Sequence, residues 1–224
     1  MKRTLPFPVF LIMITLMNCS NKPQTLVCLG NSLTAGHGAV IPQIDDREKS
    51  FPAYLQKKIK NSVINAGVSG DTTAQGLSRV KNEVLKADPG IVIIELGAND
   101  LFQRIPLSDT RENLQNIINL INDGKRKIYL VRFYTESIAR EWITMFQIND
   151  YDEQTTIINQ YNEMFTTLAK NNNIELIEDI WEGVWGVHMS DEVHPNAKGY
   201  EAIAENIFKI MKPYLLKNKL LANQ

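Results

Sequence analysis

Two runs of apolar, mostly β-branched residues most constrain how this chain can fold. Residues 91–94 (Ile-Val-Ile-Ile) and 128–131 (Ile-Tyr-Leu-Val) contain no charged residue. Such runs are typical of strands that a parallel sheet buries on both faces. Further strands are predicted at residues 26–29, 63–66 and 174–177. The chain therefore has the elements of a sheet with covered faces.

Segments with apolar residues at helical spacing separate these strands. The sequence predicts helices over residues 51–59, 73–85, 110–121, 155–170 and 196–214. Since strands and helices alternate, we expect an α/β fold, a three-layer α/β/α sandwich around a parallel central sheet. The active site of such a fold lies at the carboxyl ends of the strands.

Length and charge narrow the possible functions. The chain has 224 residues, which is enough for one domain with a sizeable core. Its formal net charge is −1, so no basic field favours nucleic acid as a partner.

The first 19 residues have the organisation of a secretory signal peptide. Lys2 and Arg3 precede an apolar stretch over residues 5–17. This stretch of 13 residues is shorter than the ~20 residues that a membrane-spanning helix needs. A short apolar stretch after a basic start instead indicates a signal for export.

The end of this segment resembles the lipobox of bacterial lipoproteins. Its sequence is Leu16-Met17-Asn18-Cys19-Ser20, although a small residue is more usual at the place of Asn18. We expect Cys19 to be lipidated and residues 20–224 to form a single domain. The protein would then be exported to the cell envelope or periplasm and anchored to a membrane by its lipid. A plain cleaved signal and an uncleaved anchor are the alternatives.

Two short segments near the ends of the chain carry residues suited to nucleophilic catalysis. Ser32 follows the strand at 26–29, and Asp191 stands three residues before His194. Together they can supply a nucleophile, a general base and the group that orients the base. Taken alone, Ser32 is better explained as a helix N-cap, and Asp191 with His194 as part of a surface loop; the presence of all the blocks together favours a catalytic site.

Four blocks, in order, resemble those of the SGNH (GDSL-type) hydrolases: Gly30-Asn31-Ser32-Leu33, Gly70, Gly97-Ala98-Asn99-Asp100 and Asp191-Glu192-Val193-His194. The resemblance runs from about residue 25 to about residue 213. Residues 65–77 and 95–100 are similar to the bacterial thioesterase, arylesterase and lysophospholipase branch. The resemblance implies a flavodoxin-like α/β/α fold and a carboxylic ester hydrolase.

The resemblance also implies the role of each residue. Ser32 would be the nucleophile, His194 the base and Asp191 its partner. The oxyanion hole would consist of the backbone N–H groups of Ser32 and Gly70 and the side-chain amide of Asn99. Small acyl esters or lysophospholipids would be the substrates. This chemistry needs no cofactor and no metal.

One position departs from the family pattern. The family usually has Asp before the serine, and this chain has Asn31. Asn is nearly isosteric with Asp and still accepts a hydrogen bond, but it carries no charge. We therefore expect activity to persist and the stability of the local turn to change.

Apolar residues in the loops after the blocks are candidates for the walls of a substrate pocket. They are Phe102, Ile105, Trp142 and Trp185. Trp142 belongs to residues 137–146, whose helical spacing suits either a short lid or a cover for the sheet edge. So much apolar material favours an acyl ester over a highly polar sugar.

Four further residues have ordinary structural explanations. Cys28 fits a small core residue, His37 a surface-loop histidine, and Pro195 the start of the last helix. His188 stands near Asp191 and His194, but too few further ligands are present to indicate a metal site.

Three functions are compatible with the sequence. The first is an esterase of the arylesterase, lysophospholipase or acyl-thioesterase kind. The second is a carbohydrate O-deacetylase of the same fold. The third is a non-catalytic, surface-anchored binding protein, which the joint presence of all five block residues disfavours. Chain-length preference on p-nitrophenyl esters separates the first two.

Overall fold

The structure is a computed structural model that describes residues 25–145 and 147–222. Five parallel strands form one sheet in the order β2-β1-β3-β4-β5. Their bounds are β1 Leu26–Gly30, β2 Val63–Gly67, β3 Ile91–Glu95, β4 Lys127–Val131 and β5 Glu175–Ile177. All five predicted strands are confirmed. The predicted signal peptide and Cys19 lie outside the described residues.

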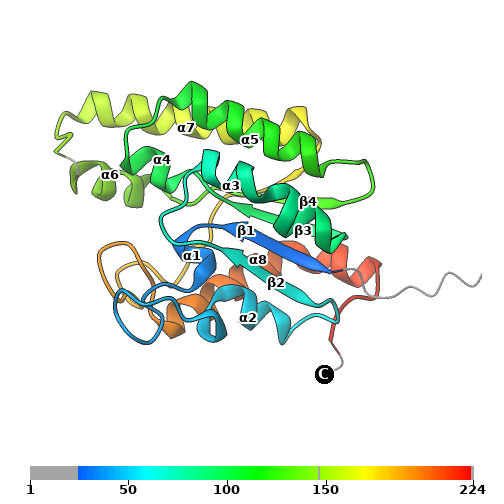
Figure 1. The fold of residues 1–224 in the computed structure, drawn as a ribbon. Helices are drawn as coiled ribbons and strands as arrows, with labels where there is room; N and C mark the ends of the chain where they lie inside the picture. Colours follow the sequence, from blue (N-terminus) through cyan, green and yellow to red (C-terminus); the bar gives the residue numbers. More distant parts are fainter. Residues whose placement is uncertain (1–24, 146, 223–224) are drawn as a thin grey trace, which may run out of the picture.

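Helices cover both faces of this sheet. Within the described ranges the α-helices are α1 Ser32–Ala35, α2 Phe51–Gln56, α3 Thr73–Arg79, α4 Ala98–Phe102, α5 Leu107–Ile121, α6 Glu136–Met145, α7 Tyr151–Asn171 and α8 Ala197–Lys217. Figure 1 shows α2 and α8 on one face and α3, α5 and α7 on the other. This arrangement confirms the three-layer α/β/α sandwich.

Burial follows the sequence pattern that predicts the strands. Every residue of β1 and β3 is buried, as expected for central strands with helices on both faces. Cys28, in the middle of β1, has no exposed surface and belongs to the core. The edge strand β2 is less enclosed, and its Ile64 is partly exposed.

Each predicted helix differs from the observed one in at least one bound, and two of these differences change the local structure. The helix expected over residues 73–85 ends as an α-helix at Arg79 and continues as a π-helical turn, Val80–Val84, and a 3-10 turn. The last helix has Asn196 as its N-cap, so Pro195 precedes the helix instead of starting it. Pro195 instead forms an isolated antiparallel bridge with Met189.

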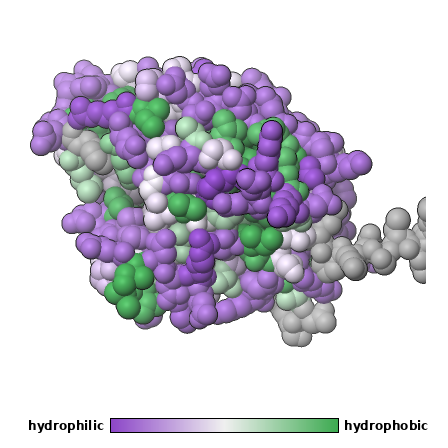
Figure 2. Space-filling model, in the orientation of Figure 1, coloured by the Kyte–Doolittle hydropathy of each residue, from purple (hydrophilic) through white to green (hydrophobic). Residues whose placement is uncertain are grey.

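The carboxyl ends of β1, β2 and β3 lead to Ser32, Gly70 and Asn99, respectively. In Figure 1 this edge of the sheet lies at the left, near α1 and the loop that precedes α8. Figure 2 shows a mostly hydrophilic surface with small apolar patches. None of the helices in the described part of the chain has the length and hydropathy needed to cross a bilayer.

Candidate active site

Ser32 stands at the amino end of a four-residue helix directly after β1. Asn31 is the N-cap of this helix, because its side-chain oxygen accepts a hydrogen bond from the Leu33 N–H at 3.0 Å. Ser32 is thus the first helical residue and not the cap. The N–H of a first helical residue has no partner within the helix, so it is available to a ligand.

His194 and Asp191 extend a hydrogen-bonded chain that begins at Ser32. The distance from His194 Nε2 to Ser32 Oγ is 3.0 Å. His194 Nδ1 lies 3.0 Å and 2.9 Å from the two carboxylate oxygens of Asp191. The fold therefore brings together the hydroxyl, the imidazole and the carboxylate of the three residues that the sequence predicts to act as nucleophile, base and orienting group.

The turn before α8 holds the Asp191 carboxylate in place. The backbone N–H groups of Val193 and His194 donate to Asp191 Oδ1 at 2.9 Å and 2.7 Å. Burial alone would raise the pKa of Asp191, but these bonds and the one from the His194 ring bring it below its ordinary value. Asp191 is therefore ionised at neutral pH.

The imidazole beside this carboxylate is neutral at the same pH. Burial lowers the pKa of His194 below 6.5, although the hydrogen bond and the charge of Asp191 oppose the change. A neutral imidazole can accept a proton from Ser32, which is what a general base requires.

Gly70 and Asn99 follow β2 and β3 at the same edge of the sheet. Gly70 has a φ of +87°, and no atom of the described residues lies within 4 Å of the place where a Cβ would stand, so a ligand can approach its backbone. Asn99 donates one side-chain N–H to the Asp71 backbone carbonyl at 2.9 Å. This bond fixes the amide, whose nitrogen carries a second hydrogen.

A buried carboxylate lies beneath the Ser32 turn. Glu95, the last residue of β3, accepts bonds from Asn31 Nδ2 at 3.1 Å, Thr34 Oγ1 at 2.9 Å and the Asn31 N–H at 3.4 Å. Burial raises the pKa of Glu95 to about 7, although these bonds oppose the change. Asn31 therefore ties α1 to β3 at a place where an aspartate would bring a second carboxylate against Glu95.

Two aspartates adjacent to the blocks support the backbone. Asp100 accepts a bond from the Thr73 backbone N–H at 2.8 Å and another from the Thr73 hydroxyl. Asp71 accepts a bond from Arg79 Nε at 2.8 Å. The bonds of Asp100 connect α4 to the beginning of α3. The bond of Asp71 connects the Gly70 turn to the end of α3.

A cavity of about 120 Å³ adjoins Ser32, His194 and Asn99. Phe102 and Trp142 line its apolar part, with their ring centroids 5.3 Å apart in an edge-to-face arrangement. The cavity is thus lined both by the polar side chains of the candidate site and by two aromatic rings.

Two residues predicted for the pocket walls lie elsewhere. Trp185 is not among the lining residues, because it packs behind Trp142 at a centroid distance of 5.6 Å. Ile105 is also outside the lining. Its N–H donates to the Asp100 carbonyl, in the connection between α4 and α5.

The segment predicted as a lid or an edge cover forms α6. Four of its residues are buried, and they are Ile138, Ala139, Trp142 and Ile143. Helix α6 therefore packs into the molecule, with α7 as a neighbour, and through Trp142 it contributes one wall of the cavity.

His37 differs from the predicted surface-loop histidine. Its ring centroid lies 4.5 Å from that of His194, and its Nδ1 lies 2.7 Å from Asp45 Oδ1. The sequence places His37 five residues after Ser32, but it gives no sign that the following loop brings Asp45 back to it.

For His188, no group of three or more potential ligands that could hold a metal occurs among the described residues.

Comparison with known families identifies the family of this chain. The sequence model of the GDSL-like lipase/acylhydrolase family matches residues 28–202. The chain belongs to this family. The match includes all four blocks that carry the resemblance, and it confirms both the predicted family and the predicted class of carboxylic ester hydrolase.

Relatives of this GDSL-like hydrolase cover most of its length. The arylesterase of Vibrio mimicus is 28% identical over 207 residues, which are 88% of this chain and 92% of the relative. Thioesterase 1/protease 1/lysophospholipase L1 of Escherichia coli (strain K12) is 28% identical over 218 residues, 93% and 92% of the two chains. Esterase TesA of Pseudomonas aeruginosa is 26% identical over 200 residues, 86% and 90%.

Solved structures show the same fold. The crystal structure of TesA has a TM-score of 0.68 and 25% identity, and the match covers 85% of this chain and 99% of that one. The SGNH-hydrolase family esterase AlinE4 has a TM-score of 0.56 and 27% identity, with coverage of 88% and 97%. The acetyl xylan esterase AlAXEase shares the fold at a TM-score of 0.65 and 19% identity, with coverage of 83% and 98%.

Proposed function

We propose that this hydrolase cleaves esters of short acyl groups by a serine mechanism that uses Ser32, His194 and Asp191. One observation carries the proposal: Ser32 Oγ lies 3.0 Å from His194 Nε2, and His194 Nδ1 lies 2.9 Å from Asp191. Ser32 and His194 also line a cavity that is large enough for a small acyl group.

In this mechanism Ser32 Oγ attacks the ester carbonyl carbon while His194 Nε2 takes its proton. Asp191 orients the imidazole and stabilises the imidazolium that forms. His194 then gives the proton to the leaving alcohol, and the acyl group stays on Ser32. A water molecule, deprotonated by the same imidazole, hydrolyses this acyl-enzyme and restores the serine.

The attack places a negative charge on the carbonyl oxygen, which needs hydrogen-bond donors. The proposed donors are the backbone N–H groups of Ser32 and Gly70 and the amide of Asn99. The open backbone at Gly70 and the fixed orientation of Asn99 support this assignment.

The size of the cavity supports a short acyl group. Its volume is about 120 Å³, and Phe102 and Trp142 close its apolar side. Pockets for larger ligands have volumes of roughly 300–1,000 Å³. We therefore expect acetyl to butyryl esters to be preferred over octanoyl and palmitoyl esters. The same small cavity favours, as a second candidate, an O-deacetylase that acts on acetylated carbohydrate.

Hydrolysis of p-nitrophenyl acetate, butyrate, octanoate and palmitate by the full-length protein tests the proposal, with Ser32→Ala in parallel. The proposal expects activity on the two shorter esters that Ser32→Ala abolishes. Equal activity in the variant would refute the serine mechanism. A preference for octanoate or palmitate would refute the short-acyl assignment, and activity on acetate alone would favour the deacetylase.

We also propose that the protein is exported and anchored by a lipid on Cys19. The basic start, the apolar stretch and the lipobox-like end of residues 1–20 support this proposal. Incorporation of a labelled fatty acid in cells would test it. Label should disappear in Cys19→Ser and persist in Cys28→Ser, which changes the other cysteine; equal label in both variants would contradict the proposal.

A further inference from the structure

We propose that Asp45 is a positioning residue. It connects His37, which packs against His194, to the turn that carries Gly70. This inference rests on the proposed serine mechanism, because it concerns how that site is held. Asp45 Oδ1 accepts a bond from Ser69 Oγ at 2.6 Å and lies 2.7 Å from His37 Nδ1. A single oxygen atom thus connects two segments that reach different parts of the site.

The first connection leads to the proposed base. The His37 ring lies 4.5 Å from the His194 ring at an interplanar angle of 57°. Tyr200 holds His37 from its backbone, by donating from its hydroxyl to the His37 carbonyl at 2.7 Å. Since His37 packs against the imidazole, its position limits how far that imidazole can tilt away from Ser32.

The second connection leads to the oxyanion hole. Ser69 precedes Gly70, whose turn has a positive φ and open space where a side chain would stand. Arg79 and Asn99 hold the Asp71 side of this turn, and Gly70 itself is exposed. The bond from Ser69 to Asp45 restrains the Gly70 N–H, and small displacements of a donor strongly reduce transition-state stabilisation.

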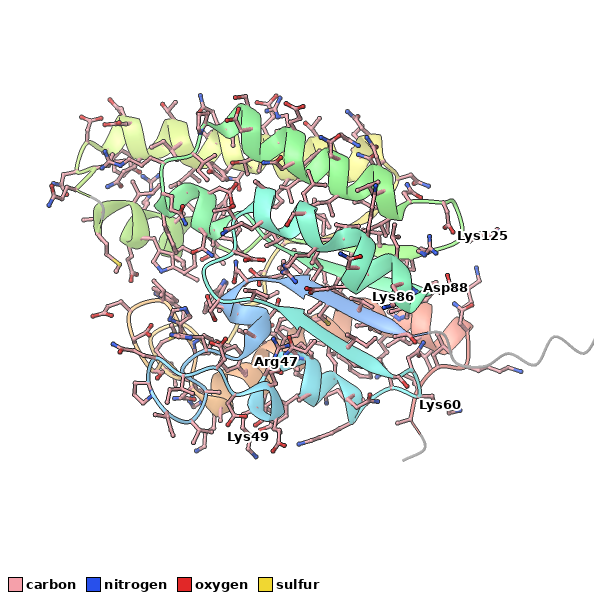
Figure 3. All side chains as sticks on the ribbon, viewed as in Figure 1. Arg47, Lys49, Lys60, Lys86, Asp88 and Lys125 are labelled. Carbon is pink, nitrogen blue, oxygen red and sulfur yellow. The ribbon has the colours of Figure 1, made fainter. Side chains whose placement is uncertain are left out.

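Asp45 lies at the fixed base of its loop. The Gly38 N–H donates to the Ile44 carbonyl at 2.9 Å, and the Asp46 N–H donates to the Gly36 carbonyl at 3.0 Å. Next along the chain is Arg47, which Figure 3 shows near α1 and β2. Its guanidinium donates to the Gly67 carbonyl at 2.8 Å, and this bond fixes the loop to the strand that leads to Ser69.

The charge state of Asp45 suits an acceptor of two bonds. Burial alone would raise the pKa of Asp45, but the bonds from Ser69 and His37 and the nearby charge of Arg47 bring it below its ordinary value. Its side chain is 37% exposed. Water therefore weakens these bonds, and we expect a moderate effect on the rate instead of complete loss.

The test compares Asp45→Ala with Asp45→Asn in the full-length protein, using p-nitrophenyl butyrate. Loss of both connections should lower kcat about tenfold in Asp45→Ala and leave KM nearly unchanged, because the geometry matters most in the transition state. Asp45→Asn keeps an oxygen that can accept both bonds and should retain most of kcat. Within the described residues, the side chain of the neighbouring Asp46 accepts bonds from the backbone N–H groups of Glu48 and Lys49 and from no part of the site, so Asp46→Ala should keep kcat.

A double-mutant cycle separates positioning from general destabilisation. Ser69→Ala removes one connection and should lower kcat in the wild-type background, but not further in Asp45→Ala. The rate of inactivation by diethyl p-nitrophenyl phosphate should fall in parallel, because its phosphoryl oxygen uses the same donors. Thermal unfolding confirms that each variant is folded at the assay temperature.

Three results would overturn the proposal: a wild-type kcat in Asp45→Ala, equal losses in Asp45→Ala and Asp45→Asn, or additive losses with Ser69→Ala. The failure of the serine mechanism has a different signature, which is activity that survives in Ser32→Ala. The two failures are therefore distinguishable.

Discussion

Two carboxyl groups lie close to the Ser32 turn, and their surroundings shift their pKa values in opposite directions. The Asp191 side chain is 27% exposed, and hydrogen bonds from two backbone N–H groups and His194 lower its pKa. Glu95 has no exposed surface, and burial raises its pKa to about 7 despite its bonds with Asn31 and Thr34. Burial opposes ionisation of both groups, and only at the partly exposed Asp191 do the hydrogen bonds outweigh it.

The difference fits the work that each group does. Asp191 faces an imidazole that becomes cationic in the proposed mechanism, so its negative charge is needed there. Glu95 accepts bonds from α1 and holds the end of β1 against β3, a task that requires acceptor oxygens but no charge. Mutations that remove the charge of Asp191, replace Glu95 by an amide or add a carboxyl group at Asn31 test whether the two groups have these different roles.

The largest expected effect comes from neutralising Asp191. Asp191→Asn keeps the shape of the side chain but removes its charge, and it permits the wrong tautomer of His194. We expect kcat to fall by about 10⁴-fold, as for the corresponding change in other serine hydrolases. Steady-state kinetics on p-nitrophenyl butyrate measure this loss. Glu192→Gln, an equal change at the exposed neighbouring carboxylate, should keep kcat; a similar loss in both variants would contradict the assignment.

Much of this site could be predicted from sequence because strand ends position it. Buried β-branched runs predict β3 and β4, and the alternating order predicts where their carboxyl ends meet. Ser32, Gly70 and Asn99 follow such ends, so their proximity needs no further information. The approach of His194 to Ser32 depends on the resemblance to a family, since no local pattern joins residues 162 positions apart.

The rest of the site depends on loops, whose paths have no sequence period. His37 contacts Asp45 only because the loop between them turns back on itself. Trp185 packs against Trp142 instead of lining the cavity. The helices α1 and α4 have four and five residues, which are too few to show a helical period. Pro195 suits a first helical position, but Asn196 caps the helix more effectively through two backbone N–H groups.

Glu95→Gln is expected to change how the free energy of unfolding depends on pH. Between the ordinary glutamate pKa of 4.5 and the raised value of about 7, the folded state holds a proton that the unfolded state has released. The free energy of unfolding of the wild type should therefore fall as pH rises through this window. At 1.36 kcal/mol per pKa unit the fall is about 3 kcal/mol.

Glu95→Gln should flatten this dependence, because the amide does not titrate. Urea unfolding at pH 5 and pH 7.5, followed by tryptophan fluorescence, measures it. Glu192→Gln serves as the control and should keep the wild-type slope. If Glu95→Gln kept that slope as well, another group would be responsible.

A smaller effect is expected from Asn31→Asp, which restores the residue usual in the family. The bond from Asn31 Nδ2 to Glu95 Oε1 would be replaced by a contact between two carboxyl groups, one of which must hold a proton. We expect a loss of about 1–2 kcal/mol in the free energy of unfolding, greater at pH 8 than at pH 5.

Asn31→Ala provides the matched comparison for this change. It removes the N-cap and the donor to Glu95 but adds no charge, so its loss of about 1 kcal/mol should not grow beyond the wild-type dependence on pH. Equal losses at pH 5 and pH 8 in Asn31→Asp would show that the two carboxyl groups do not interact.

The smallest effect is a displacement of the pH profile of activity. Only the neutral imidazole of His194 can accept the proton of Ser32, so kcat/KM should fall as pH decreases through the pKa of His194. Burial places that pKa below the ordinary 6.5, and the acidic limb should have its midpoint there. Rates on p-nitrophenyl butyrate from pH 4.5 to pH 8.5 locate the midpoint. A midpoint above 6.5 would mean that the charge of Asp191 outweighs burial, and the contrast between the two carboxylates would then extend to the base itself.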